Sequence, residues 1–171
     1  DGTTWSKLGE DIDGEAAYDS SGTSVSLSAD GRTVAIGSMG NDGTTGTATT
    51  PQGHVRIYQY DATKVSAQPD QTLANFGPTG WNRLGSDIDG EDVGDLSGRS
   101  VSLSADGRTV AIGATLNDDG PGNDSGHVRI FSYDGSTWSQ LGLDIDGEVG
   151  NDRSGYSVSL SADGRTVAIG A

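Results

Sequence analysis

The sequence predicts an all-β protein made of β-propeller-type repeats, in which each blade is a four-stranded antiparallel sheet. First, the stretch S-V-S-L-S-A-D-G-R-T-V-A-I-G occurs three times without a single change. Second, a tryptophan-containing segment lies 19 residues before each copy. Third, an H-V-R-I strand follows the first two copies. Four strands in each period of this length are typical of a propeller blade. Two full blades plus parts of a third predict an incomplete ring.

The repeated stretch, at residues 24–37, 100–113 and 157–170, is predicted to be a β-hairpin. Aliphatic residues alternate with small ones in both S-V-S-L and T-V-A-I, which is the strand pattern. The intervening Asp-Gly favours a tight turn, because glycine tolerates a positive φ. The second face carries only Ser, Thr and Ala. We therefore expect the aliphatic face of a neighbouring sheet to cover it.

Two further strands complete each predicted blade. The segments at Trp5, Trp81 and Trp138 read W-x-x-L-G-x-D-I-D-G-E, and we expect a strand through Trp and Leu, followed by a turn at the glycine after D-I-D. The segments 53–60 and 126–133 begin with G-H-V-R-I, and their Val and Ile share one face. The predicted unit is therefore hairpin, long loop, H-V-R-I strand, short turn and Trp strand.

The repeats divide the chain into four predicted parts. Residues 1–21 are the outer strand of a preceding blade and an acidic turn, 22–97 are a blade with an insertion at 61–80, 98–154 are a blade, and 155–171 are the first hairpin of a further blade. The Trp-to-Trp period is 76 residues across the insertion and 57 in the next repeat. Because the chain begins and ends inside a repeat, we expect a piece of a longer protein or a trimmed product.

Composition excludes several classes of function. The net charge is −15 and the pI near 4.1, which disfavours binding to nucleic acid or to an anionic membrane surface. The absence of cysteine excludes disulfides and thiolate metal sites. No apolar run is as long as a membrane span. The acidity suits calcium or a salty medium.

The hairpin with its flanks resembles the FG-GAP repeat of integrin α-type propellers and their relatives. The Phe-Gly position of that family is taken by Ser21-Gly22, and the Gly-Ala position by Gly37-Ser38 or Gly113-Ala114. The family's calcium loop between these strands is reduced here to the turn at 29–32. The hairpin and H-V-R-I strand are also similar to a WD-repeat, although the Gly-His and Trp-Asp pairs are missing. The resemblance implies an extracellular adhesion, recognition or structural module.

An acidic motif, D-I-D-G-E, is the main candidate for metal binding. Carboxylates alternating around a glycine turn offer the hard oxygen ligands that calcium prefers. The alternative is a solvated outer strand and turn whose charges protect a sheet edge. The spacing is not that of an EF-hand loop. The calcium hypothesis concerns these nine residues: Asp11, Asp13, Glu15, Asp87, Asp89, Glu91, Asp144, Asp146 and Glu148.

The remaining candidate residues favour structural roles. His54 and His127 are isolated and one per blade, so the sequence predicts no metal site there, and the arginine two residues after each is expected to pair with carboxylates between blades. Tryptophan at a fixed repeat position is more often blade packing than a sugar-stacking platform. Asn123 begins an N-glycosylation tripeptide in a variable loop. There is no G-x-S-x-G nucleophile motif.

Two function hypotheses follow. The first is a non-enzymatic extracellular or cell-surface repeat module for adhesion, recognition or structural assembly, because near-identical repeats leave no unique polar constellation for catalysis. Its partners would be a protein, a glycan or further copies of the same repeat; no cofactor is required, and calcium is the one candidate. The alternative is a carbohydrate-binding or carbohydrate-processing propeller domain, with its site in further blades or in the 61–80 insertion.

Overall fold

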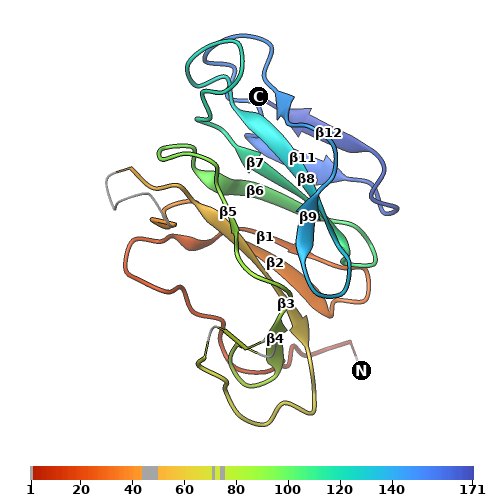
Figure 1. Ribbon diagram of the computed structural model, residues 1–171. Coiled ribbons are helices and arrows are strands. Elements are labelled where there is room, and N and C mark those ends of the chain that lie inside the picture. Colours follow the sequence, from red (N-terminus) through yellow and green to blue (C-terminus); the bar gives the residue numbers. More distant parts are fainter. Residues whose placement is uncertain (1, 44–49, 71, 74–75) are drawn as a thin grey trace.

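The computed structural model describes residues 2–43, 50–70, 72–73 and 76–171. These residues form three antiparallel β-sheets and contain no helix, which confirms the all-β prediction (Figure 1). The sheets do not close into a ring. The described part of the chain has no helix long and apolar enough to cross a membrane.

Each of the first two sheets contains five strands in equivalent positions. Sheet one has the order β1-β2-β3-β4, with β5 also pairing with β3. Its strands are β1 (Ser21–Leu27), β2 (Thr33–Ser38), β3 (His54–Tyr60), β4 (Trp81–Arg83) and β5 (Ile88–Asp89). Sheet two repeats this arrangement with β6 (Ser97–Leu103), β7 (Thr109–Ala114), β8 (His127–Tyr133), β9 (Trp138–Gln140) and β10 (Ile145–Asp146).

Sheet three is the hairpin of β11 (Ser157–Leu160) and β12 (Val167–Gly170). All three predicted hairpins are therefore confirmed, with the same cross-strand register. The turn of the first hairpin shows why. The Asp30 carboxylate accepts hydrogen bonds from the Ser28 hydroxyl (2.6 Å) and from the Arg32 amide (2.9 Å), while Gly31 takes a φ of 66°. Asp106 and Asp163 repeat the contacts at the other turns.

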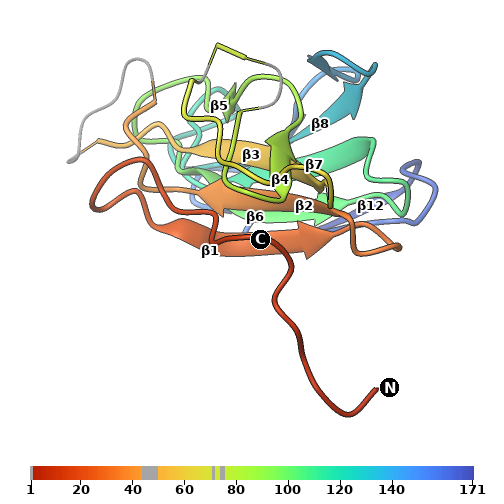
Figure 2. The same cartoon turned by 90° about the horizontal axis from the view of Figure 1, so that it is seen from below.

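The sheets lie side by side, with the hairpins of consecutive repeats in contact (Figures 1 and 2). The small-residue face of sheet one is covered by the aliphatic face of sheet two, as predicted. In the main core, Ala35, Val55 and Ile57 of sheet one cluster with Val101 and Leu103 of sheet two. Small side chains on one face thus allow the next sheet to approach closely.

A ladder of side-chain to backbone hydrogen bonds joins consecutive hairpins and repeats itself. The Ser24 hydroxyl donates to the carbonyl of Gly98, and the Ser100 hydroxyl donates to the carbonyl of Gly155, both at 2.7 Å. Leucine amides donate to the Ser26 and Ser102 hydroxyls at 2.9 Å. The serines of the repeat are therefore the polar contacts between sheets.

The strand predicted through Trp5 is not formed, and residues 2–20 contain no strand. The equivalent strands β4 and β9 each pair with the H-V-R-I strand that precedes them. No strand of the described residues pairs with the backbone of the Trp5 segment. The segment instead runs along sheet one and then away from it (Figure 2), and Trp5 is fully exposed.

Candidate functional site

Two clusters of charged and imidazole side chains occupy equivalent places in the two five-stranded sheets. The first cluster consists of Glu15, His54, Arg56 and Asp87, and the second of Glu91, His127, Arg129 and Asp144. In each, the ligand atoms of the glutamate, histidine and aspartate lie within 4.8 Å of one another. Each cluster combines three separate segments of the repeat.

The fold explains how these segments meet. Each histidine is the first residue of its H-V-R-I strand, and the arginine two residues later points to the same side of the strand. The short I-D strand of the following acidic motif pairs with this strand, so that His54 lies opposite Asp89 and His127 opposite Asp146. The glutamate comes from the acidic motif one repeat earlier. A cluster therefore forms wherever two acidic motifs flank one H-V-R-I strand.

Arg56 pairs with both carboxylates of the first cluster. The Arg56 guanidinium donates to both carboxylate oxygens of Asp87 at 2.9 and 2.7 Å, and it also forms an ion pair with Glu15. Arg83 adds a hydrogen bond to Asp87 at 2.7 Å. Burial opposes the charge on Arg56, yet the carboxylates of Asp87 and Glu15 raise its pKa above the ordinary value. The cation that balances this cluster is thus supplied by the protein.

The second cluster differs at two points. Gln140 occupies the position of Arg83 and donates to Asp144 at 2.6 Å. Arg129 lies 3.5 Å from a Glu91 oxygen, and it donates to the carbonyl of Asp89 at 2.7 Å. The bidentate pair with the following aspartate, seen in the first cluster, is not among the ion pairs of these described residues. The second cluster therefore holds less positive charge.

His127 is fully buried in the second cluster, and neither ring nitrogen has a hydrogen-bond partner among the described residues. The nearest carboxylate oxygen belongs to Glu91, 3.7 Å from Nδ1. Burial, followed by the charge of Arg129, lowers the pKa of His127 and so favours the neutral imidazole. A neutral buried imidazole without partners can accept a proton or bind a metal.

The carboxylates of the D-I-D-G-E motifs meet across consecutive repeats. Among the described residues, no D-I-D-G-E motif brings its own three carboxylates together as a ligand group. Instead, the glutamate of one motif meets the first aspartate of the next. Burial, with the charge of Asp87 added, raises the pKa of Asp89, which lies beside the first cluster. Calcium binding by these nine residues stays a prediction.

The prediction that Arg56 and Arg129 pair with carboxylates is confirmed. His54 and His127 were expected to be isolated, but each belongs to one of the two clusters. The order of the segments could have indicated this grouping. The acidic motif pairs with the start of the H-V-R-I strand, and the histidine is the first residue of that strand. The first glutamate could not be placed without knowing how consecutive repeats stack.

Two of the three tryptophans connect consecutive repeats. The Trp81 indole N–H donates to the carbonyl of Leu8 at 3.2 Å, and that of Trp138 donates to the carbonyl of Leu84 at 2.7 Å. Each ring lies against the glycine that follows that leucine, at Gly9 or Gly85. These contacts agree with the structural interpretation of the tryptophans.

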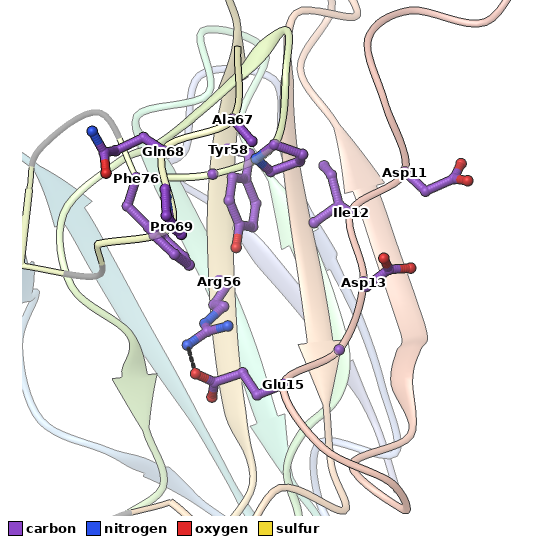
Figure 3. Close-up of a pocket in the computed structure, with 13 residues that line it drawn as sticks. Asp11, Ile12, Asp13, Glu15, Arg56, Tyr58, Ala67, Gln68, Pro69 and Phe76 are labelled. Atoms are coloured by element: carbon purple, nitrogen blue, oxygen red, sulfur yellow. Dashed lines mark ion pairs between the residues drawn. The ribbon is translucent and has the colours of Figure 1, made fainter.

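A pocket of about 270 Å³ lies between the N-terminal acidic segment and the 61–80 insertion (Figure 3). Tyr58 and Phe76 supply aromatic surface, while Asp13, Glu15 and Arg56 supply charge. The insertion has no equivalent in the next repeat, so this pocket is unique to sheet one within the described chain. It combines the aromatic and polar groups that sugar-binding sites use.

Asn123 lies exposed in the loop between β7 and β8. Ser125 of the same tripeptide is fully buried, and its hydroxyl donates to the carbonyl of Asn117 at 3.4 Å. The asparagine side chain is thus accessible in the folded protein, whereas the serine is not. Glycosylation of Asn123 stays a prediction.

Comparison with known proteins adds no family. No protein-family model matches the chain, and no curated protein matches it significantly.

Proposed function

We propose that this chain is a non-enzymatic, β-propeller-type structural module of a secreted or cell-surface protein, and that it works by stacking its sheets against further copies of the same repeat. The observation that carries the proposal is a difference between identical hairpins. Val101 and Leu103 of sheet two are 8% and 6% exposed, whereas the equivalent Val25 and Leu27 of sheet one are 64% and 60% exposed. The same surface is covered in one repeat and open in another.

The tryptophan–glycine contacts that join consecutive repeats are also incomplete at the first and last repeat. Trp81 and Trp138 each dock against a glycine of the preceding repeat, yet Trp5 is fully exposed. At the other end of the series, a side chain at Gly142 would meet no atom within 4 Å, so the place that receives a tryptophan is vacant. An exposed indole and a vacant receiving site on opposite sides favour a head-to-tail partner.

The partner that fits best is a second copy of this chain. The S-V-S-L strand of sheet two already packs in this molecule against the small-residue face of the preceding repeat, with matching serine hydrogen bonds. Exposed aliphatic surface of this kind is expected at an interaction site. A second copy offers the same small-residue face with the same register. The resemblance to FG-GAP repeats supports the extracellular setting and the blade-type arrangement.

Sedimentation velocity over a range of concentrations tests this proposal. We expect reversible association of the unmodified chain and a large loss of association in Leu27→Glu, because the charge would be buried at the interface. Val65→Glu is the matched control, since Val65 is 85% exposed in the insertion, away from the hairpin. A chain that stays monomeric up to about 1 mM, the weak end of protein affinities, would refute the proposal.

The pocket beside the insertion supports a second candidate function, carbohydrate binding. Tyr58 and Phe76 could stack on a sugar ring while Asp13 and Glu15 accept hydrogen bonds from its hydroxyls. Chemical-shift mapping with a panel of neutral and acidic oligosaccharides tests this function. Shifts confined to residues of the pocket, and lost in Phe76→Ala, would support it. Shifts elsewhere, or none, would exclude this pocket as a glycan site.

A further inference from the structure

We propose that Glu91, His127 and Asp144 form a binding site for a divalent transition metal of the zinc type, which joins sheet two to the acidic segment that follows sheet one. This inference is independent of the stacking proposed above. It concerns a different part of the surface and a different kind of ligand. It rests on the burial of His127, the distances within the cluster and the contrast with the first cluster.

The first argument is the environment of His127. A buried polar group without a hydrogen bond is costly, so most buried polar groups have a partner. His127 is fully buried, both ring nitrogens lack a hydrogen-bond partner among the described residues, and Nδ1 faces a Glu91 oxygen at 3.7 Å. Both ring nitrogens of His127 are unpaired beside the carboxylates of Glu91 and Asp144. This arrangement indicates that a ligand binds to one of the two nitrogens.

The second argument is geometric. Zinc binds histidine nitrogen and carboxylate oxygen at about 2.0–2.2 Å in a tetrahedron, which separates neighbouring ligand atoms by about 3.4 Å. The distance of 3.7 Å between His127 Nδ1 and Glu91 Oε2 is close to this value. All three ligand atoms lie within 4.8 Å of one another. Small rotations of the two carboxylate side chains would complete three ligands, leaving the fourth position to water.

The third argument is electrostatic. In the first cluster, the guanidinium of Arg56 lies between the two carboxylates and takes the place of a cation. In the second cluster, Arg129 lies 3.5 Å from a Glu91 oxygen and donates to the carbonyl of Asp89, while the neutral Gln140 contacts Asp144. Glu91 and Asp144 therefore approach each other with less positive charge beside them than Glu15 and Asp87 have. A bound cation would supply the missing positive charge in the second cluster.

The donor set decides which metal fits. One imidazole nitrogen with two carboxylates suits zinc and similar ions, whereas calcium takes six to eight oxygen ligands. A tetrahedral site of this size therefore differs from the calcium site predicted from D-I-D-G-E. The metal would connect Glu91, which follows β5, to His127 at the start of β8 and to Asp144 just before β10. It would thus cross-link two consecutive repeats.

Titration of the metal-free chain with zinc chloride in a calorimeter tests the site. We expect one strong site per chain, and a loss of affinity of tenfold or more in Glu91→Gln and in Asp144→Asn, because each removes a charged ligand. His54→Gln is the matched control for His127→Gln, since it replaces the equivalent histidine of the first cluster. It should leave zinc affinity unchanged. Cobalt(II) provides a second readout, because tetrahedral coordination gives an intense visible absorption that His127→Gln should abolish.

Three outcomes would overturn the proposal. The first is zinc binding that is equally strong in Glu91→Gln, which would indicate adventitious binding to the acidic surface. The second is loss of binding in His54→Gln with retention in Asp144→Asn, which would assign the metal to the first cluster. The third is the absence of a stoichiometric zinc site in the unmodified chain. Glu91 is partly exposed at its side chain, so Glu91→Gln should fold and give an interpretable result even if His127→Gln does not.

Discussion

Leu27 and Leu103 offer a matched test of how the sheets are stabilised. Both lie in the same S-V-S-L strand sequence, so a change to alanine alters local strand propensity and the unfolded chain equally. Leu103 is 6% exposed and Leu27 is 60% exposed, so the buried fractions of the two side chains differ by 54%. Complete burial of leucine is worth about 1.5–3 kcal/mol, which gives a difference of about 1–1.5 kcal/mol from solvent transfer alone.

The cavity left at Leu103 increases this difference. Leucine-to-alanine changes in closed cores cost about 2–5 kcal/mol, because the surroundings relax only in part. We therefore expect Leu103→Ala to lower the free energy of unfolding by about 2–4 kcal/mol and Leu27→Ala by less than about 1 kcal/mol. The larger loss corresponds to a decrease in Tm of about 4–16 °C for a domain of this size.

Urea denaturation followed by tryptophan fluorescence measures both losses, at a protein concentration low enough to keep the chain monomeric. The same variants in a concentrated sample give a second result, since Leu27→Ala should then weaken association. Equal losses in the dilute sample would refute the reasoning, because they would mean that the face of sheet one carrying Leu27 is covered within a single molecule.

Three more predictions follow from the described contacts. Gly113→Ala should destabilise the chain strongly, because its Cβ would collide with the carbonyl oxygen of Gly155, whereas Gly170→Ala meets only its own hairpin and should cost far less; thermal unfolding compares them. Arg56→Leu should lower the unfolding free energy by about 1.5–3 kcal/mol, because it removes the charge-assisted hydrogen bonds to Asp87. Urea denaturation measures this loss, and an unfolding free energy equal to that of the unmodified chain would disprove the prediction. The amides of Thr137 and Ser136 lower the pKa of Asp134 from 3.8 to about 2. The stabilising contribution of Asp134 is therefore complete above pH 3.8 and disappears as the pH falls towards 2. NMR titration of the carboxyl group checks the pKa, and Asp134→Asn should remove this part of the pH dependence of stability.

Much of the local structure could be predicted from the residues alone. The alternation of S-V-S-L and T-V-A-I, with Asp-Gly between them, predicted all three hairpins, because strand faces and tight turns depend on neighbouring residues. The small-residue face predicted a closely packed neighbour for the same local reason. The strand through Trp5 was predicted wrongly, since a strand needs a partner and no sequence pattern states whether one is present.

The grouping of side chains in the candidate site could not be predicted from the sequence. Identical D-I-D-G-E motifs looked like three equal groups, yet the structure joins Glu91 of one motif to Asp144 of the next, with His127 between them. The two clusters then differ in the contacts of their arginines, Arg56 and Arg129. They also differ by one substitution, Arg83 in the first and Gln140 in the second, which matters because both residues reach the same carboxylate position.

The sequence by itself thus determined the three hairpins, the repeat and the acidic surface, because these depend on periodicity, turn chemistry and composition. Only the tertiary structure decided which identical residues are buried and which carboxylates meet. Val25 and Val101 are the same residue in the same local sequence, and stacking alone makes one exposed and the other part of the core. Burial and charge pairing depend on contacts between repeats, which a sequence of identical repeats does not distinguish.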